Sequence, residues 1–216
     1  MFRIRALRIA SAVAVAVAAA AVLPAVGQAA LVTFGSGLGS PASVAIAHPV
    51  DTAFWSTALS GAKTRAPQKG QVLQVTMRGC AKRGSGGQSP LTQIHFQVLS
   101  PGAGSAATIQ LTSGPFNLPA CGGSVSGATV STYHPIGLCV AKGDYVAFND
   151  EGGFAPAGFP GGVGYEVFAP QAGASTNSFT SAGGTNNGDH VSGSAHKGLE
   201  LLMQLQLGTG HNSACG

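Results

Sequence analysis

Hydrophobic and polar residues alternate with a period of two along several short segments of the chain. Between residues 72 and 78, for example, Leu73, Val75 and Met77 alternate with polar neighbours. The other alternating segments are residues 92–98, 107–112 and 200–207. Successive side chains of a β-strand point to opposite faces, so this pattern predicts strands with one buried face and one polar face.

Shorter apolar segments predict further strands at residues 31–34, 44–47, 129–133 and 165–168. In the stretch of residues 136–154, two β segments flank a turn in which Gly143 can adopt the positive φ that turns often require. No segment beyond the N-terminal region has the pattern of an amphipathic helix. The sequence therefore predicts an all-β fold, an antiparallel β-sandwich of jelly-roll type with roughly eight short strands and long Gly-rich loops.

The N-terminal region has the pattern of a secretory signal peptide. Three arginines precede an apolar run, residues 9–23, and the small residues Gly27 and Ala29 suit a cleavage site. A membrane anchor is disfavoured because the Ala-dominated run is short for the roughly 20 strongly apolar residues of a spanning helix. We therefore expect a signal peptide at residues 1–29, and one domain at residues 30–216 without an integral membrane span.

Charged residues are few and nearly balanced in the expected mature chain. The full sequence has 11 Lys and Arg against 7 Asp and Glu, and 8% charged residues in all. The three arginines Arg3, Arg5 and Arg8 lie in the expected signal peptide, which leaves eight basic residues against seven acidic ones. Ordinary soluble domains contain about 25% charged residues. This composition argues against a nucleic-acid partner and fits a protein that works outside the cell among neutral polymers or other proteins.

Four cysteines remain after removal of the expected signal peptide. An even number of cysteines in an oxidising compartment predicts two disulfides rather than a zinc site, which would require closely spaced pairs. The four cysteines, Cys80, Cys121, Cys139 and Cys215, allow three pairings. We expect Cys121 to pair with Cys139, and Cys80 with Cys215.

Three segments carry a resemblance to known proteins: GQVLQVTMRG at residues 70–79, IHFQVLSP at residues 94–101 and LCVAKGDYV at residues 138–146. They resemble segments of uncharacterised secreted bacterial jelly-roll proteins, which are similar in turn to galactose-binding-like and carbohydrate-binding modules. The resemblance implies a jelly-roll fold and a role in binding a glycan, but no particular ligand residue. The single tryptophan, Trp55, is expected in the core rather than on a sugar-binding surface.

A polar patch is predicted if residues 72–78 and 92–98 are hairpin neighbours in one sheet. Arg78 would then lie on the same face as the polar side chains of the second segment, Gln93, His95 and Gln97. Their planar donors and acceptors suit sugar hydroxyls. For the histidine, hydrogen bonding between strands is favoured over metal ligation.

The acidic loop that follows the second β segment suggests calcium as an alternative to a simple turn. Asp150 and Glu151, joined by Asp189 from a second Gly-rich loop, could supply oxygen ligands. The spacing does not match an EF-hand, and solvated turn residues are the favoured interpretation. No other cofactor is expected.

The sequence predicts a non-catalytic protein. It contains no Gly-x-Ser-x-Gly elbow before a helix, and its seven carboxylates form no recognisable pair for general acid–base catalysis. The expected function is that of a secreted, extracellular or envelope-associated binding module for a glycan or cell-envelope polymer. The alternative is a structural or protein-interaction component of the envelope or of an extracellular coat, without a small ligand.

Overall fold

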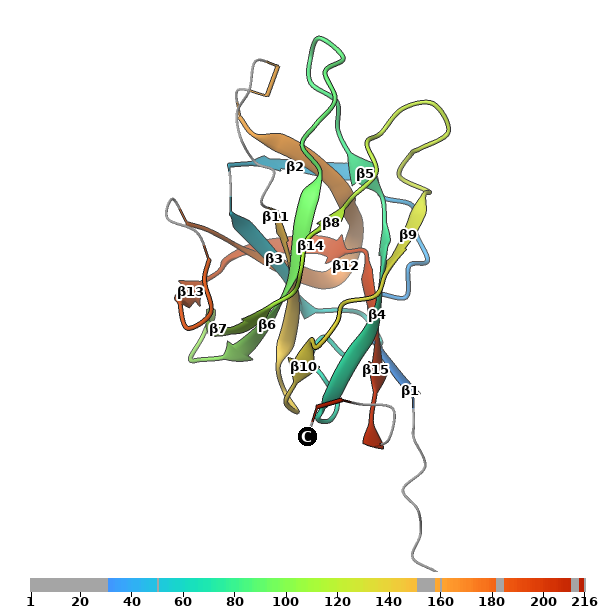
Figure 1. Cartoon of the computed structure of the whole chain (residues 1–216). Helices are drawn as coiled ribbons and strands as arrows, with labels where there is room; N and C mark the ends of the chain where they lie inside the picture. Colours follow the sequence, from blue (N-terminus) through green and yellow to red (C-terminus); the bar gives the residue numbers. More distant parts are fainter. Residues whose placement is uncertain are drawn as a thin grey trace, which may run out of the picture.

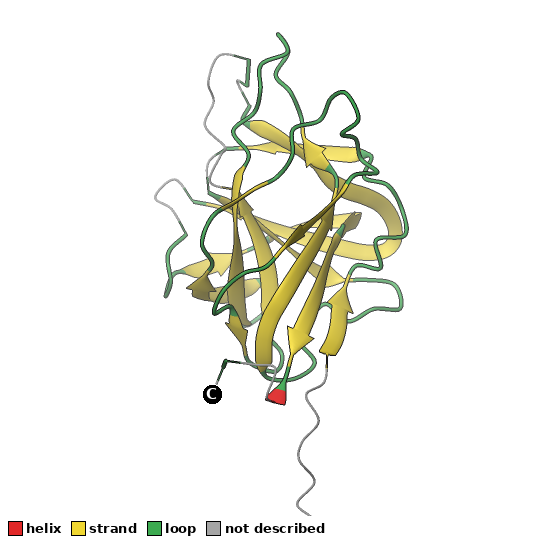
Figure 2. Ribbon diagram, turned by 45° about the vertical axis from the view of Figure 1, so that its right-hand side comes forward, coloured by secondary structure: helices red, strands yellow, loops and turns green. Residues whose placement is uncertain are grey.

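The computed structural model describes residues 31–49, 51–150, 158–159, 161–181, 185–210 and 214–215. These residues form two antiparallel β-sheets that curl into a half-barrel (Figure 2). None of them belongs to an α-helix. The all-β, antiparallel sandwich prediction is confirmed. The predicted signal peptide and Glu151 lie outside the described residues.

One sheet contains five strands of the described chain, four of which, β1, β4, β9 and β15, lie on the right-hand side of Figure 1. Its order is β1-β15-β4-β10, with β9 beside β10 on the same edge of β4. The strands of this five-stranded sheet are β1 (Leu31–Gly35), β4 (Gly70–Arg78), β9 (Val130–Tyr133), β10 (Cys139–Val140) and β15 (Met203–Gly208).

The second sheet contains ten strands of the described chain, in the order β13-β7-β6-β11-β3-β12-β14, with β2 and β5 on β12 and β8 on β6. The long strand β12 has a register shift between Pro170 and Ser175, which lets it pair with β2, β3, β5 and β14 along its length. The strands are β2 (Val44–His48), β3 (Thr52–Ala58), β5 (Cys80–Ala81), β6 (Gln93–Pro101), β7 (Ala106–Thr112), β8 (Phe116–Asn117), β11 (Tyr145–Asp150), β12 (Val163–Thr180), β13 (His190–Ser192) and β14 (Ser194–Leu201).

The chain passes from one sheet to the other at two neighbouring corners. Gly79 separates β4 of the five-stranded sheet from β5 of the ten-stranded sheet, and Leu202 separates β14 from β15. The amide of Arg78 donates to the carbonyl of Leu202, which joins the corners. Gly79 has a φ of 127°, and a Cβ there would lie 1.9 Å from the Glu166 carbonyl oxygen, so only glycine fits this bend.

Two hydrophobic clusters lie on opposite faces of the ten-stranded sheet. The larger lies between the two sheets and includes Phe54 and Phe148. The smaller lies on the other face and includes Trp55 and Ile109, with Val191 of β13 packed among them. Trp55 is 1% exposed, which confirms its predicted core position. Because β3 lies between the two clusters, it has no exposed polar face.

The disulfides differ from the predicted pairing. Cys80 is bonded to Cys121, and Cys139 to Cys215, so the prediction was wrong. The corner at Gly79 carries Cys80 into the ten-stranded sheet, where the Cys121 amide donates to the Ala81 carbonyl. Cys139 of β10 lies opposite Gln71 of β4 in the five-stranded sheet. The side-chain oxygen of Gln71 accepts a hydrogen bond from the Ala214 amide, which brings the C-terminal segment to β10.

Candidate functional site

The predicted polar patch is not assembled, because its two strands lie in different sheets. Arg78 lies on β4 of the five-stranded sheet, whereas Gln93, His95 and Gln97 lie on β6 of the ten-stranded sheet. The assumed hairpin between these strands was wrong: β4 pairs with β9, β10 and β15, and β6 pairs with β7, β8 and β11. Of the three residues on β6, only Gln93 is exposed.

The chain itself covers the polar side chains in the middle of β6. The side-chain amide of Gln97 donates to the carbonyl oxygen of Thr185 at 2.9 Å, and that of Asn149 donates to the Thr185 hydroxyl at 2.6 Å. Asn149 also donates to the side-chain oxygen of Gln97. His95 is 8% exposed, and its Nδ1 donates to the Ser113 carbonyl. Gln97 and Asn149 therefore hold Thr185, before β13, against the sheet, and His95 holds Ser113, after β7.

Removing Asn149 should weaken this attachment. In Asn149→Ala, the buried oxygens of Gln97 and Thr185 each lose a donor, and we expect unfolding to require about 2 kcal/mol less free energy. Urea unfolding of the variant measures the change. The matched control, Asn117→Ala, removes an exposed amide and should change the free energy of unfolding by less than about 0.5 kcal/mol. Equal effects of the two substitutions would contradict a buried amide attachment.

The outer face of the five-stranded sheet is a second, uncovered polar surface. Val75 and Met77 of β4 and Leu205 of β15 point from this sheet into the core. Because side chains alternate along a strand, the residues that alternate with these three point outward. We name this surface the amide–hydroxyl face; it consists of Thr33, Gln74, Thr76, Arg78, Thr132, Gln204 and Gln206.

Strand register aligns the amide–hydroxyl face into rows. Gln206 of β15 lies opposite Gln74 of β4 on one side and opposite Thr33 of β1 on the other. In the next row, Thr76 lies between Gln204 and Thr132. Every member is at least partly exposed. Figure 2 turns this side of the molecule toward the viewer.

Hydrogen bonding on the amide–hydroxyl face leaves capacity for a ligand. Gln74 donates to the Thr76 hydroxyl, and Gln204 donates to the Ser36 carbonyl. Each side-chain amide has two donor hydrogens and an acceptor oxygen, so these bonds use part of what the face offers. The Nε of Arg78 is buried and has no hydrogen-bond partner among the described residues. The alternation of residues 200–207 marked Gln204 and Gln206 as polar, but only the pairing of β15 with β4 places them beside Arg78.

The sequence predicted that Asp150 is a solvated turn residue, but the structure places it in a buried position at the end of β11. The Tyr165 hydroxyl donates to its Oδ1 at 2.5 Å, and His48 Nδ1 lies 3.0 Å from its Oδ2. The side chains of Asp150, Tyr165 and His48 are all less than 5% exposed. Burial, and then the charge of Asp150, raise the pKa of the Tyr165 hydroxyl far above its usual value, which keeps it a proton donor.

The structure does not bring together the two described residues of the predicted calcium site. Asp150 lies opposite Ile94 of β6. The Asp189 carbonyl accepts a hydrogen bond from the Ile109 amide of β7, and Ile109 lies opposite Leu99 of β6. Ile94 and Leu99 are five positions apart on β6, a distance of roughly 16 Å. The Asp189 carboxylate is exposed and accepts a hydrogen bond from its own turn. Glu151 is outside the described residues.

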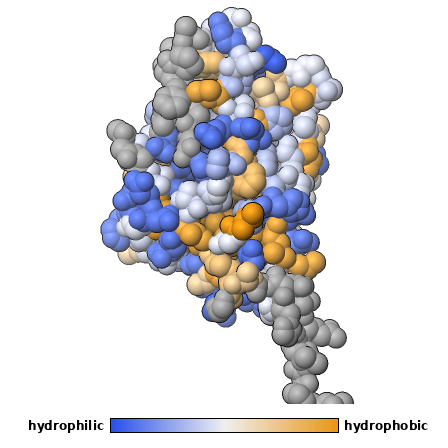
Figure 3. All heavy atoms as spheres, in the orientation of Figure 1, coloured by the Kyte–Doolittle hydropathy of each residue, from blue (hydrophilic) through white to orange (hydrophobic). Residues whose placement is uncertain are grey.

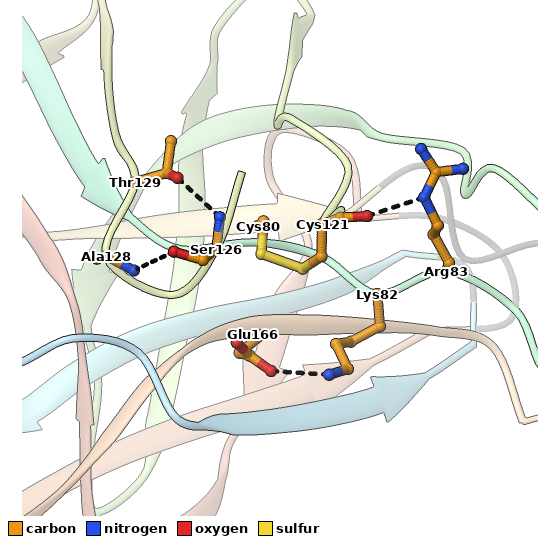
Figure 4. The surroundings of a disulfide bond; sticks show 8 residues. All are labelled: Cys80, Lys82, Arg83, Cys121, Ser126, Ala128, Thr129 and Glu166. Atoms are coloured by element: carbon orange, nitrogen blue, oxygen red, sulfur yellow. Dashed lines mark hydrogen bonds and ion pairs between the residues drawn. A yellow bond between two sulfur atoms is a disulfide. The ribbon is translucent and has the colours of Figure 1, made fainter. Parts of the chain in front are cut away.

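One group of side chains has the spacing of metal ligands but is already bonded otherwise. Cys80, Cys121 and Glu166 have potential ligand atoms within 4.8 Å of one another. The two sulfurs form a disulfide, and Glu166 forms an ion pair with Lys82 (Figure 4). The Lys82 Nζ lies 3.0 Å from the Glu166 Oε2. With their sulfurs oxidised, the cysteines offer no thiolate to a metal.

Comparison with protein-family models, with curated proteins and with solved structures finds no match for this chain. No helix in the described part of the chain is long and apolar enough to cross a membrane. The two disulfides are typical of proteins from oxidising, extracellular compartments.

Proposed function

We propose that this protein is a secreted, non-catalytic binding module that holds a neutral glycan of the cell envelope on its amide–hydroxyl face. The observation that carries the proposal is the alignment of four glutamine and threonine residues of β4 and β15, Gln74, Thr76, Gln204 and Gln206, in adjacent rows of one open sheet. Primary amides offer paired donors and acceptors that match vicinal sugar hydroxyls. Arg78 is the one charged member, which suits a neutral ligand.

Binding at this face should be weak for a single sugar segment. The aromatic residues next to it along β1 and β9, Phe34 and Tyr133, are 3% and 7% exposed and belong to the core, so neither is available to stack on a sugar ring. Hydrogen bonds exchanged with water contribute little net affinity, and we expect dissociation constants in the micromolar to millimolar range, about 4–8 kcal/mol. A repetitive polymer would compensate by presenting many equivalent segments.

A pull-down on insoluble cell-wall polysaccharide tests the proposal. The double variant Gln74→Ala, Gln206→Ala should lose at least two-thirds of the retained protein relative to wild type, because it removes adjacent amides of one row. The matched control is Gln93→Ala, Gln110→Ala, which removes two exposed glutamines of the other sheet and should be retained like wild type. Circular dichroism confirms that both variants are folded.

Equal retention of both double variants would contradict a site on the amide–hydroxyl face. Loss of binding only in the control pair would move the site to the ten-stranded sheet. Retention of neither variant nor wild type would favour the alternative function, a protein-interaction component of the envelope or coat.

That alternative has an observation of its own: Val130 and Leu31, at the edges of the same face, are 47% and 55% exposed. Figure 3 likewise shows apolar areas among the hydrophilic ones on the side viewed there.

A further inference from the structure

A cleft at one end of the sandwich gathers basic side chains. It has a volume of about 420 Å³ and lies between the segment after β3 and the turn between β10 and β11. Its lining includes Lys63, Arg65 and Lys142. Two backbone hydrogen bonds join its walls, from Gly143 to the Ala66 carbonyl and from Ala66 to the Asp144 carbonyl. The cleft therefore has a fixed shape rather than being a gap between independent loops.

An aromatic ring positions one of the basic side chains of this cleft, that of Arg65. The Arg65 guanidinium lies 4.7 Å from the centre of the Tyr145 ring, a cation–π contact that fixes the group while leaving its N–H edges open. None of the three basic side chains forms an ion pair with a described residue; the ion pairs of the described chain are Lys82–Glu166 and His48–Asp150. An adjoining hollow of about 260 Å³ beside Cys139 and Cys215 adds Lys69.

No acidic residue of the described chain lines this cleft. Asp144 follows Gly143 directly, but it is 7% exposed and its Oδ2 accepts a hydrogen bond from the Ala141 amide. Burial raises the pKa of the Asp144 carboxyl group, against the smaller opposing effect of that hydrogen bond. Glu200 lines a separate hollow on the other side of Ala62. Half of the eight basic residues expected in the mature chain thus lie in or beside this cleft.

We propose that the cleft is a second binding site, for phosphate or carboxylate groups of an acidic polymer. Guanidinium and ammonium groups around an open cleft are the donors that such anions bind. The net charge of the expected mature chain is almost zero, so the chain as a whole has no strong positive potential. The clustering of basic residues at the cleft creates a local one. The site is independent of the amide–hydroxyl face, which carries amides and hydroxyls rather than a group of cations.

Titration with two probe polymers tests the site and distinguishes the two anions. Inorganic polyphosphate and polygalacturonate are added to the protein at low salt, with neutral dextran as a blank, and binding is followed by calorimetry. The cleft variant carries Lys63→Gln, Arg65→Gln and Lys142→Gln. Its matched control removes three exposed basic residues elsewhere through Lys82→Gln, Arg83→Gln and Lys197→Gln, and so has the same net charge.

We expect wild type to bind at least one acidic probe, with affinity that falls as salt is added. The cleft variant should bind at least tenfold more weakly, and the control should stay within about threefold of wild type. Equal weakening of both triple variants would overturn the proposal, because net charge alone would explain it. Binding of neither acidic probe by folded wild type would also overturn it. A loss of glycan retention in the Gln74→Ala, Gln206→Ala variant does not bear on this site, so the two proposals can fail separately.

Discussion

Replacement of Asp150 by alanine is expected to lower the free energy of unfolding by about 3 kcal/mol, which for a domain of this size lowers the melting temperature by roughly 6–12 °C. The substitution removes the shared acceptor of the Tyr165 hydroxyl and the His48 imidazole in a place that is almost closed to solvent. The carbonyls of Leu91 and Pro49 remain within reach of these two groups and keep the loss from being larger. Thermal and urea unfolding of the folded variant measure it.

Two further substitutions separate the buried contacts from the charge of Asp150. Asp150→Asn keeps the shape and an acceptor for Tyr165, so we expect it to lose less stability than Asp150→Ala. Asp189→Ala removes an exposed carboxylate that caps a turn, and it should cost less than about 1 kcal/mol. If Asp189→Ala destabilised the protein as much as Asp150→Ala, the buried group around Tyr165 would not be the origin of the effect.

The sequence predicted best those strands that have one face in the core and one in water. In β4 and β15, Val75, Met77 and Leu205 alternate with glutamine and threonine, and this alternation identified both strands and their polar sides. The sequence also predicted a turn with a positive φ at Gly143, and the φ of Gly143 is 97°. These features depend on neighbouring residues of the chain, which is why a single sequence reveals them.

Strands that are buried on both faces were harder to predict. β3 was missed because Phe54 contacts one hydrophobic cluster and Trp55 the other, so no polar residue marks an exposed side. The short strands β5, β8 and β13 contain two or three residues each, too few for a periodic signal. These four strands account for part of the difference between the roughly eight strands expected and the fifteen of the described chain.

Contacts between distant residues account for the errors in the candidate site. Arg78 and Gln93 are close in sequence, but the corner at Gly79 sends the chain into the other sheet between them. Gln97 and His95 have the alternation of surface residues, yet Thr185 and Ser113 cover them from elsewhere in the chain. Such pairings follow from topology, and no spacing along the sequence encodes them.

Loss of the disulfide between Cys80 and Cys121 should be the most damaging change to stability. In the chain-entropy model, a separation of 41 residues corresponds to about 4 kcal/mol, and the separation of 76 residues between Cys139 and Cys215 adds only about 0.5 kcal/mol to that figure. Cys80, however, is completely buried, whereas Cys139 is partly exposed. The packing lost at Cys80, about 1 kcal/mol or more, exceeds the difference in loop entropy.

We therefore expect Cys80→Ala, Cys121→Ala to lose about 5 kcal/mol and Cys139→Ala, Cys215→Ala about 4.5 kcal/mol, measured by urea unfolding without reductant. Since natural domains have only about 5–15 kcal/mol of stability, either loss is large. A greater loss in the second variant would mean that loop length outweighs burial in this protein.

A tryptic map of the unreduced wild type provides the control. The peptide with Cys80 should be linked to the peptide that contains both Cys121 and Cys139. A direct link of the Cys80 peptide to the Cys215 peptide alone would contradict the observed pairing.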